Sequence, residues 1–194
     1  MSRLVFIYSS PVSTHTRALP LNITGIGTLG VTMTPTIRLA QSLFVAYIGV
    51  FGLLTAFGNI TDYGSNFAFV QHVMSMDTIF PESHLRYRAI TSPALHHAAY
   101  WLIILGEALT GLLCSVGALR LFLCRRCDAT TFHRTKSMAA VGLAVAFTVW
   151  FLGFMVIGGE WFAMWQSVRW DGQAAATRFL ISIGITLLLL VHEE

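Results

Sequence analysis

The residues with the most distinctive chemistry lie in one stretch, TSPALHHAAYWLIILGEALTG, residues 91–111. Two adjacent histidines, His96 and His97, stand near its start, and an acid, Glu107, lies deep in the apolar run that follows. Residues three or four apart share a helix face, so a helix would align His96, Tyr100 and Glu107. At about 1.5 Å per residue, Glu107 would lie roughly 16 Å below His96, near the middle of a hydrocarbon layer about 30 Å thick.

A carboxyl group at that depth is costly unless it is protonated, paired or turned toward a wet cavity. Ionisable residues inside the membrane are candidates for functional sites, so Glu107 could handle a proton or a ligand. The alternative interpretation is a neutral Glu107 that forms a hydrogen bond between packed helices. Arg178, which lies in the last apolar segment, could reach Glu107 or extend outward to the lipid headgroups.

The composition indicates an integral membrane protein. Hydrophobic residues make up 55 % of the 194-residue chain and charged residues 11 %, whereas soluble proteins have about 25 % charged residues. We expect spans at about residues 37–58, 93–123, 138–158 and 174–191, each long enough to cross a bilayer. Lipid requires the backbone to satisfy its own hydrogen bonds, so the predicted fold is all-α, a four-helix transmembrane bundle. Residues 33–194 would form this domain.

Residues 1–32 differ from the rest, because they contain no continuous apolar run long enough to span. We expect them to be a poorly ordered N-terminal extension.

Two connections are predicted to lie at the same end of the bundle. The first, residues 59–92, is long and polar, and its first part can form a short amphipathic helix. The second contains Trp161, Phe162, Trp165 and Trp170, an aromatic cluster typical of headgroup depth. These connections would cap the bundle on the outer side of the membrane.

The orientation follows from the positive residues, which account for the net charge of +3. They cluster around the loop at residues 124–136, so the positive-inside rule places this loop and both termini in the cytoplasm. Because the positive residues flank the spans, no nucleic-acid partner is expected. Cys124, Cys127 and the nearby His133 resemble half a zinc site, but structural zinc needs four ligands, so we expect two unreactive thiols.

Histidines and carboxylates gather on the predicted outer side, where they include His72, Asp62 and Glu160. Side chains of these types could bind a divalent metal ion, although no HExxH spacing is present. Haem is not expected, because it would need axial histidines on facing helices and three spans carry none in their interiors. No cofactor is therefore predicted.

Three segments carry a resemblance to a known family: NITDYGSNFAFVQHVMSMD (59–77), TSPALHHAAYW (91–101) and GGEWFAMWQS (158–167). They resemble a family of predicted small integral membrane proteins of Gram-negative bacteria whose function is not assigned. The resemblance covers the chain from about Met33 and implies four spans in the inner membrane. It carries no catalytic assignment. All three segments lie on the predicted outer side, so we expect the function there.

Two function classes follow. In the first, the protein is an accessory or interaction subunit of a membrane assembly, and its periplasmic cap binds other inner-membrane proteins through the aromatic cluster. In the second, it binds or moves a small ligand, metal ion or proton, using the residues Glu107, His96, His97, Tyr100, Glu160, Asp62 and His72. No broken span of the transporter type is expected, which favours the first class. An enzyme ranks third, because the sequence has no nucleophile triad or nucleotide fingerprint.

Overall fold

The structure, a computed structural model, describes residues 34–192, and these contain helices and connections but no strand. The α-helices are α1 (Thr34–Thr61), α2 (Tyr63–Ser75), α3 (Pro93–Leu123), α4 (Ala129–Phe147) and α5 (Gln173–Val191). A π-helix, η2 (Thr148–Trp161), continues α4, and two 3-10 helices, η1 (His84–Arg88) and η3 (Met164–Gln166), lie in the connections. The predicted extension at residues 1–32 lies outside the described residues.

Four helices are long and apolar enough to cross a membrane, namely Pro35–Thr61, Pro93–Leu123, Ala129–Trp161 and Gln173–Val191. The predicted all-α, four-span fold is thereby confirmed. The short helix expected in the first connection is α2, which buries Val70, Val73 and Met74. The third spanning helix, which begins with α4, starts nine residues before the span predicted at residues 138–158. Its first turns are polar, and hydropathy detects only the apolar part of a helix.

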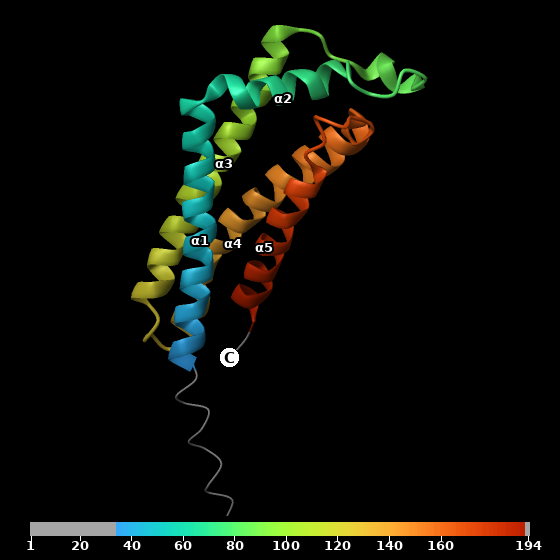
Figure 1. Ribbon diagram of the computed structural model, residues 1–194. Coiled ribbons are helices and arrows are strands. Elements are labelled where there is room, and N and C mark those ends of the chain that lie inside the picture. Colours follow the sequence, from blue (N-terminus) through green and yellow to red (C-terminus); the bar gives the residue numbers. More distant parts are fainter. Residues whose placement is uncertain (1–33, 193–194) are drawn as a thin grey trace, which may run out of the picture.

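Figure 1 shows α1 and α3 side by side, while the continuous rod of α4 and η2 leans away from them together with α5. Helix α2 runs across one end of this arrangement, where both predicted outer connections are found. Helix α1 begins and α5 ends at the opposite end, which also carries the α3–α4 turn. The even number of crossings therefore returns the chain to the side on which it entered.

Small residues allow the backbones of α1 and α3 to touch. A Cβ atom added to Gly52 would lie 2.8 Å from the Gly111 backbone nitrogen and 2.9 Å from the Glu107 carbonyl oxygen. One turn earlier, a Cβ atom added to Gly49 would lie 2.9 Å from the Ser115 backbone nitrogen. These small residues of α1 therefore form a close helix contact with α3, the usual means of helix association in lipid.

Two apolar clusters form the core. One lies between the spans and includes Val45, Cys114, Leu143 and Ile183. The other lies under α2 and includes Val70, Tyr100, Ile104 and Phe162. The second cluster attaches the two connections at this end of the bundle to the spans.

The π-helix η2 was not predicted from the sequence. Its pattern ends with a bond from the Phe162 N–H to the Ile157 carbonyl at 3.0 Å, five residues back. A π segment of 14 residues is long, since most π-helices are single-turn bulges, frequently at functional sites. The helix also continues past residue 158, where the predicted third span ended.

The α3–α4 turn is closed by a disulfide between Cys124 and Cys127, and Cys114 is free and buried. The expectation of two free thiols is wrong for this structure. Helix α4 then begins because the Asp128 carboxylate accepts the Thr131 N–H at 3.0 Å. Hydrogen bonds from Thr131 lower the pKa of Asp128.

We predict that Gly52→Ala destabilises the protein by about 1–3 kcal/mol, because the added methyl group forces the α1 and α3 backbones apart. Gly58→Ala is the matched control, since its Cβ would meet nothing within 4 Å. The measurement is the unfolding midpoint in a titration of mild detergent with denaturing detergent. Equal midpoints for the two variants would contradict close packing at Gly52.

Candidate functional site in the helical cap

We call residues 62–92 and 162–172 together the cap. Side chains connect its two segments: the Thr78 hydroxyl donates to Ser167 Oγ at 2.9 Å, and Gln166 Oε1 accepts the Phe80 N–H at 3.2 Å. Arg88 donates to the carbonyl oxygen of Glu160 at 3.3 Å, at the end of η2. The structure therefore brings the two predicted outer connections together.

The first segment of the cap is also tied to itself. Arg86 donates to the carbonyl oxygens of Ile79 and Met76 at 3.2 and 3.5 Å. The Ile90 N–H donates to the Met74 carbonyl at 2.8 Å. These bonds hold a connection without long regular structure in one conformation.

Beneath the cap, Glu107 lies at the end of a chain of amide side chains. Glu107 is only 4 % exposed, and its Oε2 accepts a hydrogen bond from Asn59 Nδ2 at 2.7 Å. Asn59 Oδ1 in turn accepts from Asn66 Nδ2 at 2.7 Å, and Asn66 is exposed on α2. Polar groups therefore connect the buried carboxyl group to the surface of the cap.

Within the described residues Glu107 forms no ion pair. Arg178, which could have reached it, is exposed on α5. A buried carboxyl group bound by an amide fits a neutral acid held between helices, one of the two interpretations left open by the sequence.

Tyr100 and His97 complete the polar layer around Asn59. Tyr100 is buried and donates to the Asn59 carbonyl oxygen at 3.2 Å. His97 is exposed, stacks on Phe67 with ring centroids 4.1 Å apart, and shares a hydrogen bond of 2.8 Å with the Tyr63 hydroxyl. These contacts attach α2 to the start of α3.

His96 faces the interior instead. Its Nε2 lies 2.6 Å from the Ile90 carbonyl oxygen and therefore carries the proton, while its buried Nδ1 has no hydrogen-bond partner. His96 thus holds the last residues of the first connection against α3. The adjacent histidines have different surroundings, as their spacing predicted.

The other candidates from the sequence lie apart from Glu107. His72 contacts Asp77 at 2.7 Å and stacks on Trp170 with centroids 4.5 Å apart. Asp62 accepts from Ser65, and Glu160 is exposed. Across residues 34–192, no three His, Cys, Asp or Glu side chains converge in a group that could hold a metal ion. His72, His96 and His97 instead lie in three separate environments.

An apolar cavity of 540 Å³ lies under α2, between α3 and the π-helix. Its wall includes Val73, Ile103, Phe154, Ile157 and Trp161. Glu107 and the histidines are not among its lining residues, so this space fits an apolar group and not a charged one. Sequence reasoning missed the cavity, and its one visible signal was the pair of η2 glycines, Gly153 and Gly158, that line it.

The exposed aromatic residues of the cap, together with the last residue of η2, form a surface that we call the aromatic rim: Phe80, Tyr87, Trp161 and Trp165. Tyr87 is 77 % exposed, Trp161 52 % and Trp165 50 %. The Phe80 and Trp165 rings meet edge to face with centroids 6.0 Å apart. Of the aromatic residues proposed for an interface, Trp161 and Trp165 are thus on the surface. Phe162, only 6 % exposed, belongs to the core under α2.

Residues 37–193 match the model of the family described as "Predicted small integral membrane protein (DUF2165)". The chain belongs to this family. The match covers all four spans and the cap, so this small integral membrane protein crosses the bilayer several times. No curated protein and no solved structure matches the chain significantly.

Substitutions of Glu107 test its role beneath the cap. We predict that Glu107→Gln keeps the stability of the protein, because the Gln carbonyl oxygen can still accept from Asn59. Glu107→Leu leaves the Asn59 amide without its partner and costs about 1–3 kcal/mol. The measurement is the unfolding midpoint in detergent. An equal loss in both variants would show that the carboxylate charge, and not the hydrogen bond, is required.

Proposed function

We propose that this membrane protein is an accessory subunit that binds another membrane protein through its cap. The observation that carries the proposal is the aromatic rim, where tryptophan and tyrosine side chains are exposed on a cap held by internal hydrogen bonds. Trp, Tyr and Arg are the residues that contribute most to binding at protein interfaces.

Charge and rigidity add to this argument. The Arg88 guanidinium lies over the rings of Trp161 and Tyr87, 5.1 and 5.4 Å from their centroids. Both aromatic side chains are thereby held in place before a partner binds, and a preformed surface loses less conformational entropy on binding. Trp161 also lines the apolar cavity, so a partner's apolar side chain could enter beside it.

The proposed location is the bacterial inner membrane, with residues 33–194 forming one membrane domain. Arginines and a lysine surround the end of the bundle opposite the cap, where Arg38 donates to the Cys127 carbonyl and Lys136 to the His192 carbonyl. By the positive-inside rule this end is cytoplasmic and the cap periplasmic.

Photo-crosslinking from the rim tests the proposal. With benzoylphenylalanine in place of Tyr87 or Trp165, we expect one discrete protein adduct in native membranes. The same group at Leu188, which is 71 % exposed on α5, should react with lipid and serves as the control. A Tyr87→Ala, Trp165→Ala double variant should weaken binding roughly tenfold, equivalent to about 1.4 kcal/mol. If the rim positions form adducts with lipid only, the aromatic rim anchors the protein at the lipid headgroups and does not bind a protein.

A second candidate function is proton handling, favoured by the amide chain from Glu107 through Asn59 to the exposed Asn66. These amides form a polar path between the buried acid and the surface, and Glu107 would be the group that takes up and releases the proton. The test uses proteoliposomes that contain a pH-sensitive dye. If the protein handles protons, acid added outside should lower the internal pH, and Glu107→Gln should abolish this change. No change with the unaltered protein would remove this candidate.

A further inference from the structure

We propose that Cys124 and Cys127 form a redox-active pair that exchanges with a small thiol–disulfide couple of the glutathione type. The pair lies at the end of the bundle opposite the cap and takes no part in the proposed interface. Its function would be to sense or transfer two electrons on the cytoplasmic side.

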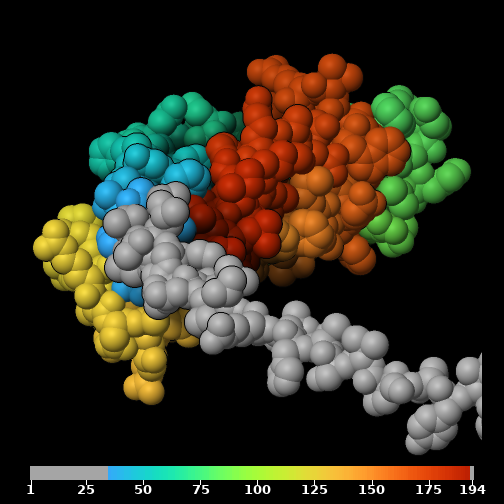
Figure 2. Space-filling view, turned by 90° about the horizontal axis from the view of Figure 1, so that it is seen from below, coloured from blue at the N-terminus to red at the C-terminus, as the bar shows by residue number. Residues whose placement is uncertain are grey.

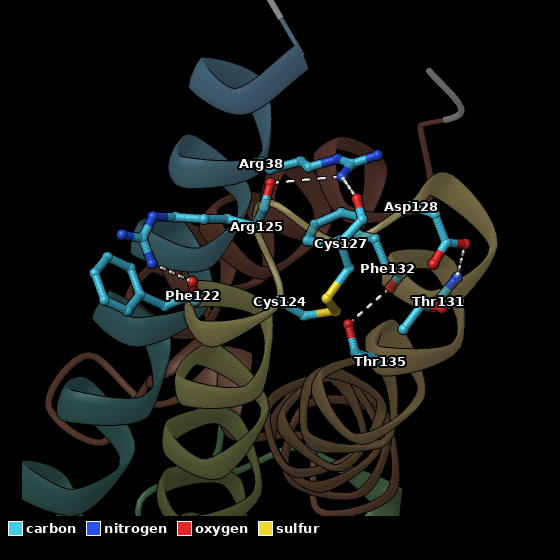
Figure 3. The surroundings of a disulfide bond; sticks show 9 residues. All are labelled: Arg38, Phe122, Cys124, Arg125, Cys127, Asp128, Thr131, Phe132 and Thr135. Atoms are coloured by element: carbon cyan, nitrogen blue, oxygen red, sulfur yellow. Dashed lines mark hydrogen bonds between the residues drawn. A yellow bond between two sulfur atoms is a disulfide. The ribbon is translucent and has the colours of Figure 1, made fainter.

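The turn brings the two sulfur atoms together without further folding. Cys124 is the C-cap residue of α3, and Cys127 directly precedes Asp128, the N-cap of α4. The Cys127 N–H donates to the Cys124 carbonyl at 2.9 Å, and their Cα atoms are 5.1 Å apart, within the range in which a disulfide can form. Figure 3 shows the bond on the inner side of the turn.

Positive charge lies beside the pair. Arg38, buried at the start of α1, donates to the Cys127 carbonyl at 2.6 Å and to the Arg125 carbonyl at 3.5 Å (Figure 3). Helix α4 begins two residues after Cys127, so its positive N-terminal end lies nearby. Cationic side chains and helix N-termini favour the thiolate form, which is the reactive form of cysteine.

The two cysteines differ in exposure. Cys124 is buried, whereas Cys127 is half-buried. Figure 2 looks onto this end and shows the yellow α3–α4 turn at the periphery, beside the blue start of α1. Cys127 is the more exposed residue of the pair, so we expect a small reagent to react with it first and Cys124 to resolve the product.

The exchange balances with one external disulfide. The Cys127 thiolate attacks one sulfur of oxidised glutathione, forms a mixed disulfide and releases one glutathione thiolate. The Cys124 thiol then loses its proton and attacks Cys127 Sγ, which forms the intramolecular bond and releases the second glutathione thiolate. The protein dithiol is oxidised by two electrons and glutathione disulfide is reduced to two thiols.

The compartment makes a purely structural bond unexpected. This step rests on the proposed orientation, in which the α3–α4 turn faces the cytoplasm. Cytosolic disulfides are rare because glutathione and thioredoxin keep thiols reduced, and those that form are usually catalytic or redox-sensing. A Cys-x-x-Cys turn next to an arginine fits a catalytic or redox-sensing disulfide.

The test uses the full chain in detergent, reduced and then mixed with oxidised glutathione, with the products identified by intact mass. Wild type should form the internal disulfide and release both glutathiones. Cys124→Ser should stop at the mixed disulfide on Cys127. Cys127→Ser should react at least about tenfold more slowly, because Cys124 is buried. Cys114, which is free and buried, is the internal control and should stay unmodified.

Several results would overturn the proposal: equal rates for the two single variants, an internal disulfide that excess reduced glutathione leaves intact, or zinc bound to the reduced pair. In cells, alkylation of free thiols should find the pair reduced and then oxidised after diamide treatment. A permanently oxidised pair would make the bond structural. A fluorescent-protein fusion at the C-terminus separates the two causes of failure, since lost fluorescence would show that the orientation itself is wrong.

Discussion

The close contact between α1 and α3 is the constraint on which the rest of the structure depends. Gly52 lies against the backbone at Gly111 and against the Glu107 carbonyl, so the two helices run side by side as far as the cap. This approach brings Asn59, near the end of α1, to the carboxyl group of Glu107. In lipid, where helices gain no hydrophobic energy by associating, such packing and interhelical hydrogen bonds provide the attraction. The polar layer is thus a product of the glycine contact.

The cap follows from the same contact. The chain turns from the end of α1 into α2 beside the first turns of α3, and α2 then runs toward the side to which the rod of α4 and η2 leans (Figure 1). Tyr63, Phe67 and His97 fix one edge of α2, and apolar side chains of the core fill the space beneath it. The remaining opening between α3 and η2 is the apolar cavity. The cap end of the bundle therefore presents aromatic side chains and an apolar cavity, whereas the opposite end is basic.

Much of the fold could be predicted from the sequence, because long apolar runs leave a chain in lipid no alternative to helices. The glycine-rich face of α1 and the differing roles of His96 and His97 also follow from local spacing. The partner of Glu107 could not be predicted in this way, since Asn59 lies 48 residues away and an amide carries no charge that would suggest the pairing. The π-helix is equally hidden, because an apolar run satisfies lipid with either hydrogen-bond pattern. The disulfide was missed because cysteines three residues apart are compatible with a bond, a metal site or neither.

Helix α1 has a property that neither of its ends shows alone. It is one uninterrupted helix of 28 residues, with Arg38 seated on the carbonyl of Cys127 near its start and Asn59 bound to Glu107 near its finish. A displacement of this helix as one rigid body would move both contacts together. Opening of the α3–α4 turn would move the oxygen on which Arg38 rests. The amide chain beneath α2 would then be strained by an event on the far side of the bilayer.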